Sequence, residues 1–311
     1  MNCSLTVLAF CLLVAAAASS ADTPRRSVGQ LVQRKNALAR IESRNAWLEA
    51  SLLSEREGAS RATLHSPLSV ALLAPYYSCP YTLLRSNLVS EHFDGGKWTC
   101  GIPETKSGGA CVVYSFGSSG NDVFEKHILS VNPSCEIHVF DPTSKPMRAY
   151  HFHKYGLCAH GSTFVAGRKT YPCRSLEHIF QELNHTEVSV LKMDIEGAEW
   201  DVFQDVQWEN LRIGQILVEF HDQDAGYTLN SIIRHYLNKL EKAGFFLFSM
   251  EPVCAGCPGQ FELGFLQVNW SPFPIRTKSK ARTHSMKPWR ALTSIEGGVN
   301  VSEGSYIMNV L

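Results

Sequence analysis

Short apolar runs alternate with segments of helical periodicity from residue 110 onward. The apolar runs predict strands over residues 111–116, 136–140, 164–166, 188–193, 215–220, 245–250 and 262–268. Helices are predicted to end near residues 131 and 203 and to span residues 175–183 and 230–243. Alternating strands and helices predict a doubly wound α/β fold, in which helices cover both faces of a parallel sheet. The last two strands have no helix between them, so we expect an antiparallel hairpin at one edge.

The chain before residue 110 has a different pattern. Residues 5–18 form an apolar run followed by small residues, a length that suits a signal peptide cleaved before Asp22. Residues 25–57 are polar, with apolar positions at helical spacing, and predict a solvated stem helix that docks weakly on the body. Those apolar positions are Leu31, Leu38, Ile41, Trp47, Leu48 and Leu52. We divide the chain into residues 1–21 (signal peptide), 22–78 (helical stem and linker), 79–272 (the α/β domain) and 273–311 (a loosely ordered tail).

Composition narrows the class of protein. The 311 residues are 44% hydrophobic and 19% charged, so the chain can bury a core. The 29 basic and 29 acidic side chains cancel, which argues against nucleic-acid binding through a basic surface. No long uncharged apolar run follows the N-terminal segment, so we expect no membrane span after cleavage.

The cysteines fit an oxidising compartment. Cleavage would remove two of the 10 cysteines and leave 10 − 2 = 8, and an even number favours disulfides in secreted proteins. Two pairs are candidate bridges, namely Cys79 with Cys100 and Cys254 with Cys257. Cys111 and Cys135 lie at strand starts, where we expect them to be buried as small hydrophobic residues.

Two further patterns bear on compartment and metal binding. Asn-x-Ser/Thr sequons occur at Asn184, Asn269 and Asn300, and with the signal segment they fit a glycoprotein of the secretory pathway. The chain has one CxxC motif and no second pair at zinc-finger spacing. His151, His153 and His160 are irregularly spaced. We therefore predict no metal site.

Residues that follow each strand are the candidate site residues, because ligands of open α/β sheets bind at the carboxyl ends of the strands. Gly117 and Gly120 follow the first strand in a turn that would let the backbone approach a ligand, although a plain connecting turn has the same composition. Asp141 follows the second strand, and it fits either a ribose-binding acid or a turn before Pro142. Its distance from the glycine turn favours nucleoside binding.

Charged side chains follow the fourth and fifth strands. Asp194 and Glu196 could orient or deprotonate a hydroxyl or hold a divalent ion, whereas Glu196 and Glu199 also suit the start of a helix. Lys192 lies within the fourth strand, where a charge requires a partner. His221 follows the fifth strand, and an ordinary pKa near ~6.5 would suit either a general base or a loop histidine.

Three blocks of sequence resemble one family. They are VVYSFGSSGNDVFE at residues 112–125, HVFDPT at residues 138–143 and LKMDIEGAEWDVF at residues 191–203. These blocks look like the FkbM-type S-adenosylmethionine-dependent methyltransferases, and more nearly like a methyltransferase-like subfamily with a Cys-bounded segment, here residues 79–100. The resemblance covers roughly residues 79–270. It implies a Rossmann-like class I methyltransferase sheet of seven strands with the last antiparallel, in agreement with the strand pattern.

The resemblance also implies a site for S-adenosyl-L-methionine. The Gly117 loop would approach the methionine part, Asp141 would bind the ribose, and Asp194 would lie where the methyl group meets the acceptor. The predicted cofactor-binding residues are Ser115, Gly117, Ser118, Gly120, Asp122, Asp141 and Pro142. Many such enzymes carry an acid where this chain has Ser115, so Asp122 or Glu125 would have to supply that contact.

The predicted function is O-methylation of a small molecule or glycan in the secretory pathway, with Asp194, Glu196 and His221 as catalytic residues and no metal. A carboxylate acceptor would need no base. One alternative is a non-catalytic secreted binding module, which Ser115 in place of an acid keeps open. Another is a lumenal glycosyltransferase, with Asp194 and Glu196 in a DxD-like site. A NAD-dependent oxidoreductase is less favoured, since GxGxxG is missing.

Overall fold

The computed structural model describes residues 28–55, 74–86, 96–103, 110–166, 168–221, 236–253 and 260–272. The predicted signal segment, most of the linker and the C-terminal tail lie outside these residues. Outside them also lie the Cys254/Cys257 pair, the Asn300 sequon and the first part of the helix predicted over residues 230–243.

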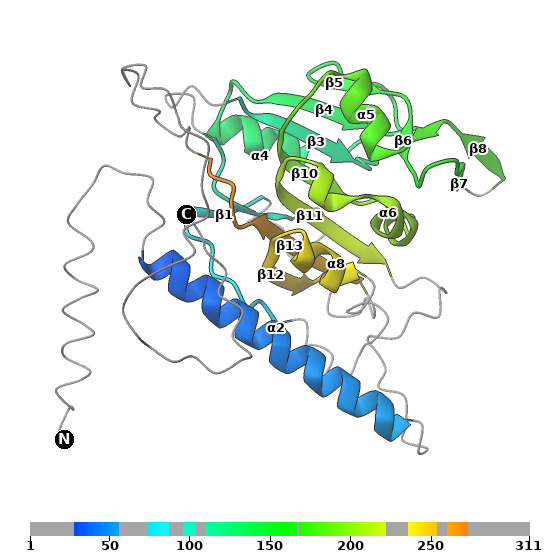
Figure 1. Ribbon diagram of the computed structural model, residues 1–311. Helices are drawn as coiled ribbons and strands as arrows, with labels where there is room; N and C mark the ends of the chain where they lie inside the picture. Colours follow the sequence, from blue (N-terminus) through cyan, green and yellow to red (C-terminus); the bar gives the residue numbers. More distant parts are fainter. Residues whose placement is uncertain are drawn as a thin grey trace, which may run out of the picture. The chain divides into compact units, whose positions relative to one another are not determined.

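A sheet of seven strands forms the centre of the fold (Figure 1). In chain order its strands are β3 (Val112–Phe116), β4 (Glu136–Phe140), β5 (His151–His153), β10 (Val188–Met193), β11 (Ile213–His221), β12 (Phe245–Pro252) and β13 (Gln260–Gln267). Across the sheet the order is β12-β13-β11-β10-β3-β4-β5. The five strands from β11 to β5 are parallel, and β13 runs antiparallel to both of its neighbours. The predicted fold class, with its antiparallel last strand, is confirmed.

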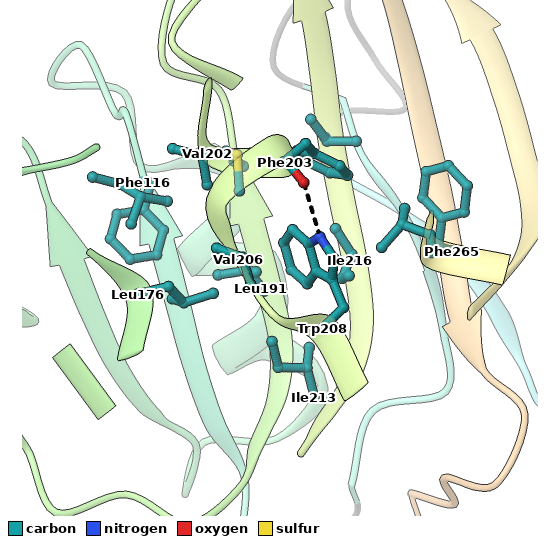
Figure 2. Close-up of a cluster of buried hydrophobic side chains, with 14 of the residues drawn as sticks. Phe116, Leu176, Leu191, Val202, Phe203, Val206, Trp208, Ile213, Ile216 and Phe265 are labelled. Atoms are coloured by element: carbon teal, nitrogen blue, oxygen red, sulfur yellow. Dashed lines mark hydrogen bonds between the residues drawn. The ribbon is translucent and has the colours of Figure 1, made fainter. Parts of the chain in front are cut away.

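Helices cover both faces of this sheet. Side chains of α5 (Leu176–Glu182), α6 (Glu199–Asp205) and α8 (Asn238–Lys242) pack in one core, and those of α4 (Val123–Val131) and α2 (Val28–Glu55) pack in the other. Alternation along the strands feeds both cores, since Tyr114 and Phe116 face the first and Val113 faces the second. Figure 2 shows part of the first core, where the Trp208 indole N–H donates to the Phe203 carbonyl at 3.4 Å.

The third strand of the sheet is not where the sequence predicts it. Residues 164–166 do form a strand, β7 (Phe164–Ala166), but it pairs with β8 (Lys169–Tyr171) in a separate two-stranded sheet. The edge position beside β4 belongs to β5, whose sequence is His-Phe-His. Because an edge strand with exposed and half-buried residues does not need an apolar run, β5 has no strand signal in the sequence. A further short pair joins β6 (Gly156–Leu157) to β9 (Cys173–Arg174).

Of the apolar positions predicted for the stem helix, Ile41 packs against the second core. Leu31 and Leu38 are 46% and 43% exposed, whereas Ala37 is fully buried. Arg44 is also buried, and its guanidinium donates to both carboxylate oxygens of Glu241 at 2.9 and 2.7 Å. The contact thus includes an ion pair that hydrophobic periodicity cannot show. In the described part of the chain, no helix combines the length and apolar character needed to span a membrane.

Three disulfides form within the described residues, and they join Cys79 to Cys100, Cys111 to Cys135, and Cys158 to Cys173. The first closes the segment that contains the antiparallel pair β1 (Leu83–Arg85) and β2 (Trp98–Cys100). Cys111 and Cys135 are buried as predicted, at 5% and 8% exposure, but they also form a bridge that was not among the two candidate pairs. They precede the neighbouring parallel strands β3 and β4, and this places their Cα atoms 4.6 Å apart, within reach of a bridge.

Candidate functional site

After β3, the chain adds β4 and β5 on one side of it and then returns to add β10 and β11 on the other side. The strand order thus reverses between β3 and β10, and a ligand-binding crevice is expected at the carboxyl ends of these two strands. The loops that follow these strands meet there. Gly117 has φ +74°, and a Cβ at this position would lie 1.6 Å from the Asp194 carbonyl oxygen. The Gly117 N–H donates to the Phe140 carbonyl at 3.0 Å, and the Asp194 N–H donates to the Phe116 carbonyl at 3.1 Å. Gly117 is therefore required by the close approach of two loops.

Asp141 joins the loop after β3 to the loop after β4. Its carboxylate accepts seven hydrogen bonds of 2.6–3.1 Å, and the donors are backbone N–H or hydroxyl groups of Ser118, Ser119, Thr143 and Ser144. Burial alone would raise the pKa of Asp141, but these hydrogen-bond donors hold that pKa well below its usual range. The side chain is 2% exposed, so in this geometry both oxygens serve the protein itself. The bonds from the Thr143 and Ser144 N–H groups to Asp141 Oδ1 form a turn around Pro142, which is the alternative to ribose binding given above.

A carboxylate lies beside Ser115, where related enzymes are expected to carry an acid. Ser115 is fully buried, and its hydroxyl donates to Glu125 Oε1. Glu125 is 1% exposed, and among the described residues its second oxygen has no hydrogen-bond partner. Asp122 instead pairs with Lys126 at 2.8 Å. Of the two acids considered from sequence, Glu125 is the one that contacts Ser115.

A lysine that the sequence analysis missed lies at the carboxyl ends of β10 and β11. Lys97 is 2% exposed, and its ammonium lies 3.2 Å from Glu219 Oε2 and 3.7 Å from Asp194 Oδ2. It also contacts Glu262 on β13. The Cys79–Cys100 segment therefore places a cation beside Asp194 and Glu219. The sequence gives one indirect sign of a buried cation here, namely the acids Glu219 and Glu262 within the strands predicted over residues 215–220 and 262–268.

Burial and mutual charge set the protonation of this cluster. Burial alone would lower the pKa of Lys97, but Glu262, Asp194 and Glu219 together raise it above its usual range. Burial raises the pKa of Glu262 to about 8, against the opposing charge of Lys97. Although burial opposes it, the hydrogen bond to His221 and the charge of Lys97 hold the pKa of Glu219 below its usual range. At neutral pH, Lys97 and Glu219 are therefore charged, whereas burial favours the protonated form of Glu262.

His221 is enclosed by carboxylates. Its Nδ1 lies 3.2 Å from Glu199 Oε1, and its Nε2 lies 3.4 Å from Glu219 Oε1 and 3.7 Å from Glu196 Oε2. Burial would lower its pKa, but the hydrogen bonds to Glu199 and Glu219 raise it to about 10. His221 therefore carries its proton at neutral pH, which favours a positioning role over that of a general base.

The turn after β10 carries two glutamates, Glu196 and Glu199, which differ in accessibility. Glu199 is fully buried and accepts hydrogen bonds from the backbone N–H groups of Ile195 at 2.7 Å and Gly197 at 2.8 Å, so it shapes the turn. The Glu196 side chain is 73% exposed, and burial of its remaining part raises the pKa of its carboxyl group. Glu196 thus presents an accessible carboxylate beside His221, whereas Asp194 is held in ion pairs with Lys97 and Lys192 at 3.7 Å each.

Asp194, Glu219 and His221 also have potential metal-ligand atoms within 4.8 Å of one another. The ammonium of Lys97 already contacts both carboxylates, and His221 is protonated. A metal ion would have to displace the lysine and remove that proton. The donor set here favours an internal cation over a bound metal.

The strand order, the reversed edge hairpin and the site at the switch point define a class I methyltransferase fold. A methyltransferase-domain family model matches residues 61–267, and the chain belongs to that family. Probable methyltransferase-like protein 24 of Rattus norvegicus and of Homo sapiens are each 32% identical to this chain, over 156 and 155 residues respectively. The matched segment covers 44% of this chain and 42% of each relative, so the chain spans less than half the length of these curated relatives.

Solved structures are more distant. A Methanococcus jannaschii fibrillarin pre-rRNA processing protein shares 10% identity over 51% of this chain and 66% of its own, with a TM-score of 0.34. A Burkholderia thailandensis 1,6-didemethyltoxoflavin-N1-methyltransferase, solved with S-adenosylhomocysteine, shares 10% identity over 51% of this chain and 71% of its own, with a TM-score of 0.29. Likenesses of this size support no conclusion about activity. The family match favours methyl transfer over the glycosyltransferase and oxidoreductase alternatives.

Proposed function

We propose that this protein is an S-adenosylmethionine-dependent methyltransferase that O-methylates a small molecule or glycan in the secretory pathway. The observation that carries this proposal is the junction at the switch point, where the Gly117 loop meets the acidic turn that begins at Asp194. In a methyltransferase-family domain, this junction supports a cofactor-binding role for the Gly117 loop and an acceptor-binding role for the accessible carboxylate of Glu196.

The residues present fit the proposed cofactor. Ser115 and Glu125 together place a carboxylate near the first turn, and the second oxygen of Glu125 is a buried acceptor without a partner among the described residues. The loop from Gly117 to Gly120 would hold the methionine part. Asp141 would bind ribose hydroxyls in exchange for one of its hydroxyl donors, Ser118 or Ser144. When bound, S-adenosylmethionine supplies an activated methyl group.

The chain's own residues then need to orient an acceptor and take a proton. Glu196 is the accessible carboxylate with a raised pKa, and we assign it the role of general base for a hydroxyl acceptor. Asp194, fixed by Lys97 and Lys192, would orient that hydroxyl. His221, as a cation between buried carboxylates, holds the turn in place. Neither Asp194 nor His221 takes the proton in this scheme.

The secretory setting is supported by the covalent chemistry of the chain. Three disulfides within the described residues fit an oxidising compartment. The sequons at Asn184 and Asn269 both place their asparagine on the surface, where a glycan can be attached. These features support a lumenal or secreted glycoprotein acting on a lumenal acceptor.

Transfer of isotopically labelled methyl groups to a panel of saccharides and small alcohols tests this proposal. Glu196→Gln should bind S-adenosylhomocysteine as wild type does but lose at least ~100-fold in transfer rate, the usual contribution of a general base. Glu187→Gln is the matched control, because Glu187 pairs with the exposed Arg212 at the surface. Transfer at the wild-type rate by Glu196→Gln would contradict its assignment as base. Binding of S-adenosylhomocysteine without any response to manganese would exclude the glycosyltransferase.

A non-catalytic binding module is the second candidate, and the saturated hydrogen bonding of Asp141 favours it. A carboxylate that serves only to join two loops would have no part in ribose binding. In that case calorimetry would show no heat with S-adenosylmethionine at high micromolar concentration, and Asp141→Ala would be indistinguishable from wild type.

A further inference from the structure

Four histidines and one glutamate gather around β4 and β5, at the edge of the sheet near α5 (Figure 1). The His138 ring stacks on the rings of His151 and His153, with centroids 4.8 and 5.2 Å apart. The His185 ring meets it edge-on at 5.0 Å. Glu136 begins β4, at the opposite end of the strand from Asp141, so this cluster is separate from the candidate catalytic site.

Three of these side chains converge in a geometry that suits a metal ion. Glu136 Oε1 lies 2.9 Å from His138 Nε2 and 3.6 Å from His185 Nε2. The ligand atoms of all three residues lie within 4.8 Å of one another. Zinc bound at ~2.0–2.1 Å to tetrahedral ligands separates them by about 3.3–3.4 Å. The two distances from Glu136 bracket that value, so small side-chain movements would complete the site.

The outer nitrogens of both imidazoles are held by neighbours. His138 Nδ1 lies 2.9 Å from His153 Nε2, and His185 Nδ1 lies 2.7 Å from the Tyr114 hydroxyl. Metal-binding histidines characteristically use the ring nitrogen that does not face the metal for a hydrogen bond, which fixes the ring orientation and the tautomer. Both rings here have that arrangement, and both direct Nε2 toward Glu136.

We propose that Glu136, His138 and His185 bind a zinc ion, with solvent as the fourth ligand. Two imidazoles and one carboxylate form a donor set that zinc accepts, whereas calcium and magnesium prefer oxygen ligands. The Glu136 side chain is 47% exposed, and that of His185 is 15% exposed. Solvent and an incoming ion can therefore reach the site. The bound ion would tie β4 to the segment between α5 and β10.

This proposal reverses the expectation of no metal site. That expectation rested on the spacing of His151, His153 and His160, and none of these is among the three proposed ligands. Glu136 and His138 lie two residues apart on β4, and His185 comes from the separate segment between α5 and β10. Their convergence is a property of the fold, so no sequence spacing could have indicated it.

Calorimetric titration of zinc into the untagged, disulfide-intact chain tests the proposal. Glu136→Gln and His185→Gln should each weaken zinc binding at least ~10-fold relative to wild type, and zinc should raise the melting temperature of wild type more than that of either variant. His178→Gln is the matched control, since His178 is an exposed histidine on α5 that pairs with Glu182. Comparison with this control separates the site from the other histidines of the chain.

Glu136 lies at the surface, so its substitution tests the site without removing a buried ring. Calcium and magnesium should produce no comparable shift in melting temperature. The proposal is wrong if wild type takes up no zinc, or if Glu136→Gln and His185→Gln bind zinc as tightly as His178→Gln. Neither result depends on methyl transfer, so the zinc site and the proposed activity succeed or fail separately.

Discussion

Substitution of Gly117 by alanine tests the junction of the two loops. An alanine at φ +74° would incur about 1–2 kcal/mol of backbone strain. Its Cβ would also lie 1.6 Å from the Asp194 carbonyl oxygen, so the loops must separate. That movement would break the hydrogen bonds from Gly117 to Phe140 and from Asp194 to Phe116, each worth about 1 kcal/mol. We expect a total loss of about 3–4 kcal/mol in the free energy of unfolding.

Gly120→Ala is the matched control. Gly120 has φ +80°, but a Cβ there would meet nothing within 4 Å, so alanine should cost only the strain of about 1–2 kcal/mol. Urea unfolding of wild type and both variants, with disulfides intact, measures the difference. Gly117→Ala should unfold at a clearly lower urea concentration than Gly120→Ala. Equal midpoints would refute the argument that the close approach to Asp194 requires glycine.

Three further variants probe the scaffold and the charged cluster. Arg44→Met should lower the free energy of unfolding by about 3–5 kcal/mol, because it leaves the buried carboxylate of Glu241 without its cationic partner. Replacing Cys111 and Cys135 by serine should cost about 3 kcal/mol in urea unfolding, since the bridge closes a loop of 24 residues. The pKa of His221 is raised to about 10 from an ordinary 6.5, so protonation of His221 stabilises the fold. This stabilisation is complete below pH 6.5 and is lost as the pH rises toward 10. Wild-type stability should fall across that range more steeply than that of His221→Gln.

Each of these variants has a clear contrary outcome. Arg212→Met removes an exposed pair and should change stability by no more than about 1 kcal/mol, so an equal effect of Arg44→Met would show that the α2 contact is weak. Unchanged urea midpoints in the doubly substituted chain would mean that the bridge does not restrain the unfolded state. Parallel pH profiles for wild type and His221→Gln would show that the imidazolium is not stabilised by its carboxylate neighbours.

The sequence predicts most of the central sheet well because apolar residues predominate in its strands. The predicted bounds of residues 136–140 and 188–193 match β4 and β10, and both strands lie between neighbours in the sheet. The edge strand β5 was missed, since its two histidines do not resemble a buried strand. The helix α2 was predicted, and its predicted apolar position Ile41 contacts the body, but Leu31 and Leu38 are exposed while Ala37 and Arg44 are buried.

The candidate site was predicted in part. The position of Asp194 and Glu196 after the fourth strand follows from topology, and the requirement of Lys192 for a partner is met by Asp194 and the Gly117 carbonyl. Lys97 could not be predicted, because its partners Glu219 and Glu262 come together only when β11 and β13 pair. The charged state of His221 likewise depends on carboxylates brought together by the fold.

Calorimetric titration of S-adenosylmethionine into the full chain tests the central claim most directly. We expect saturable binding with one site per chain for wild type. Glu125→Gln should bind at least ~10-fold more weakly, because the substitution alters the buried carboxylate that contacts Ser115. Glu187→Gln, at the surface, should bind as wild type does. Absence of heat with wild type at high micromolar ligand would contradict the assignment of this chain as an S-adenosylmethionine-dependent methyltransferase.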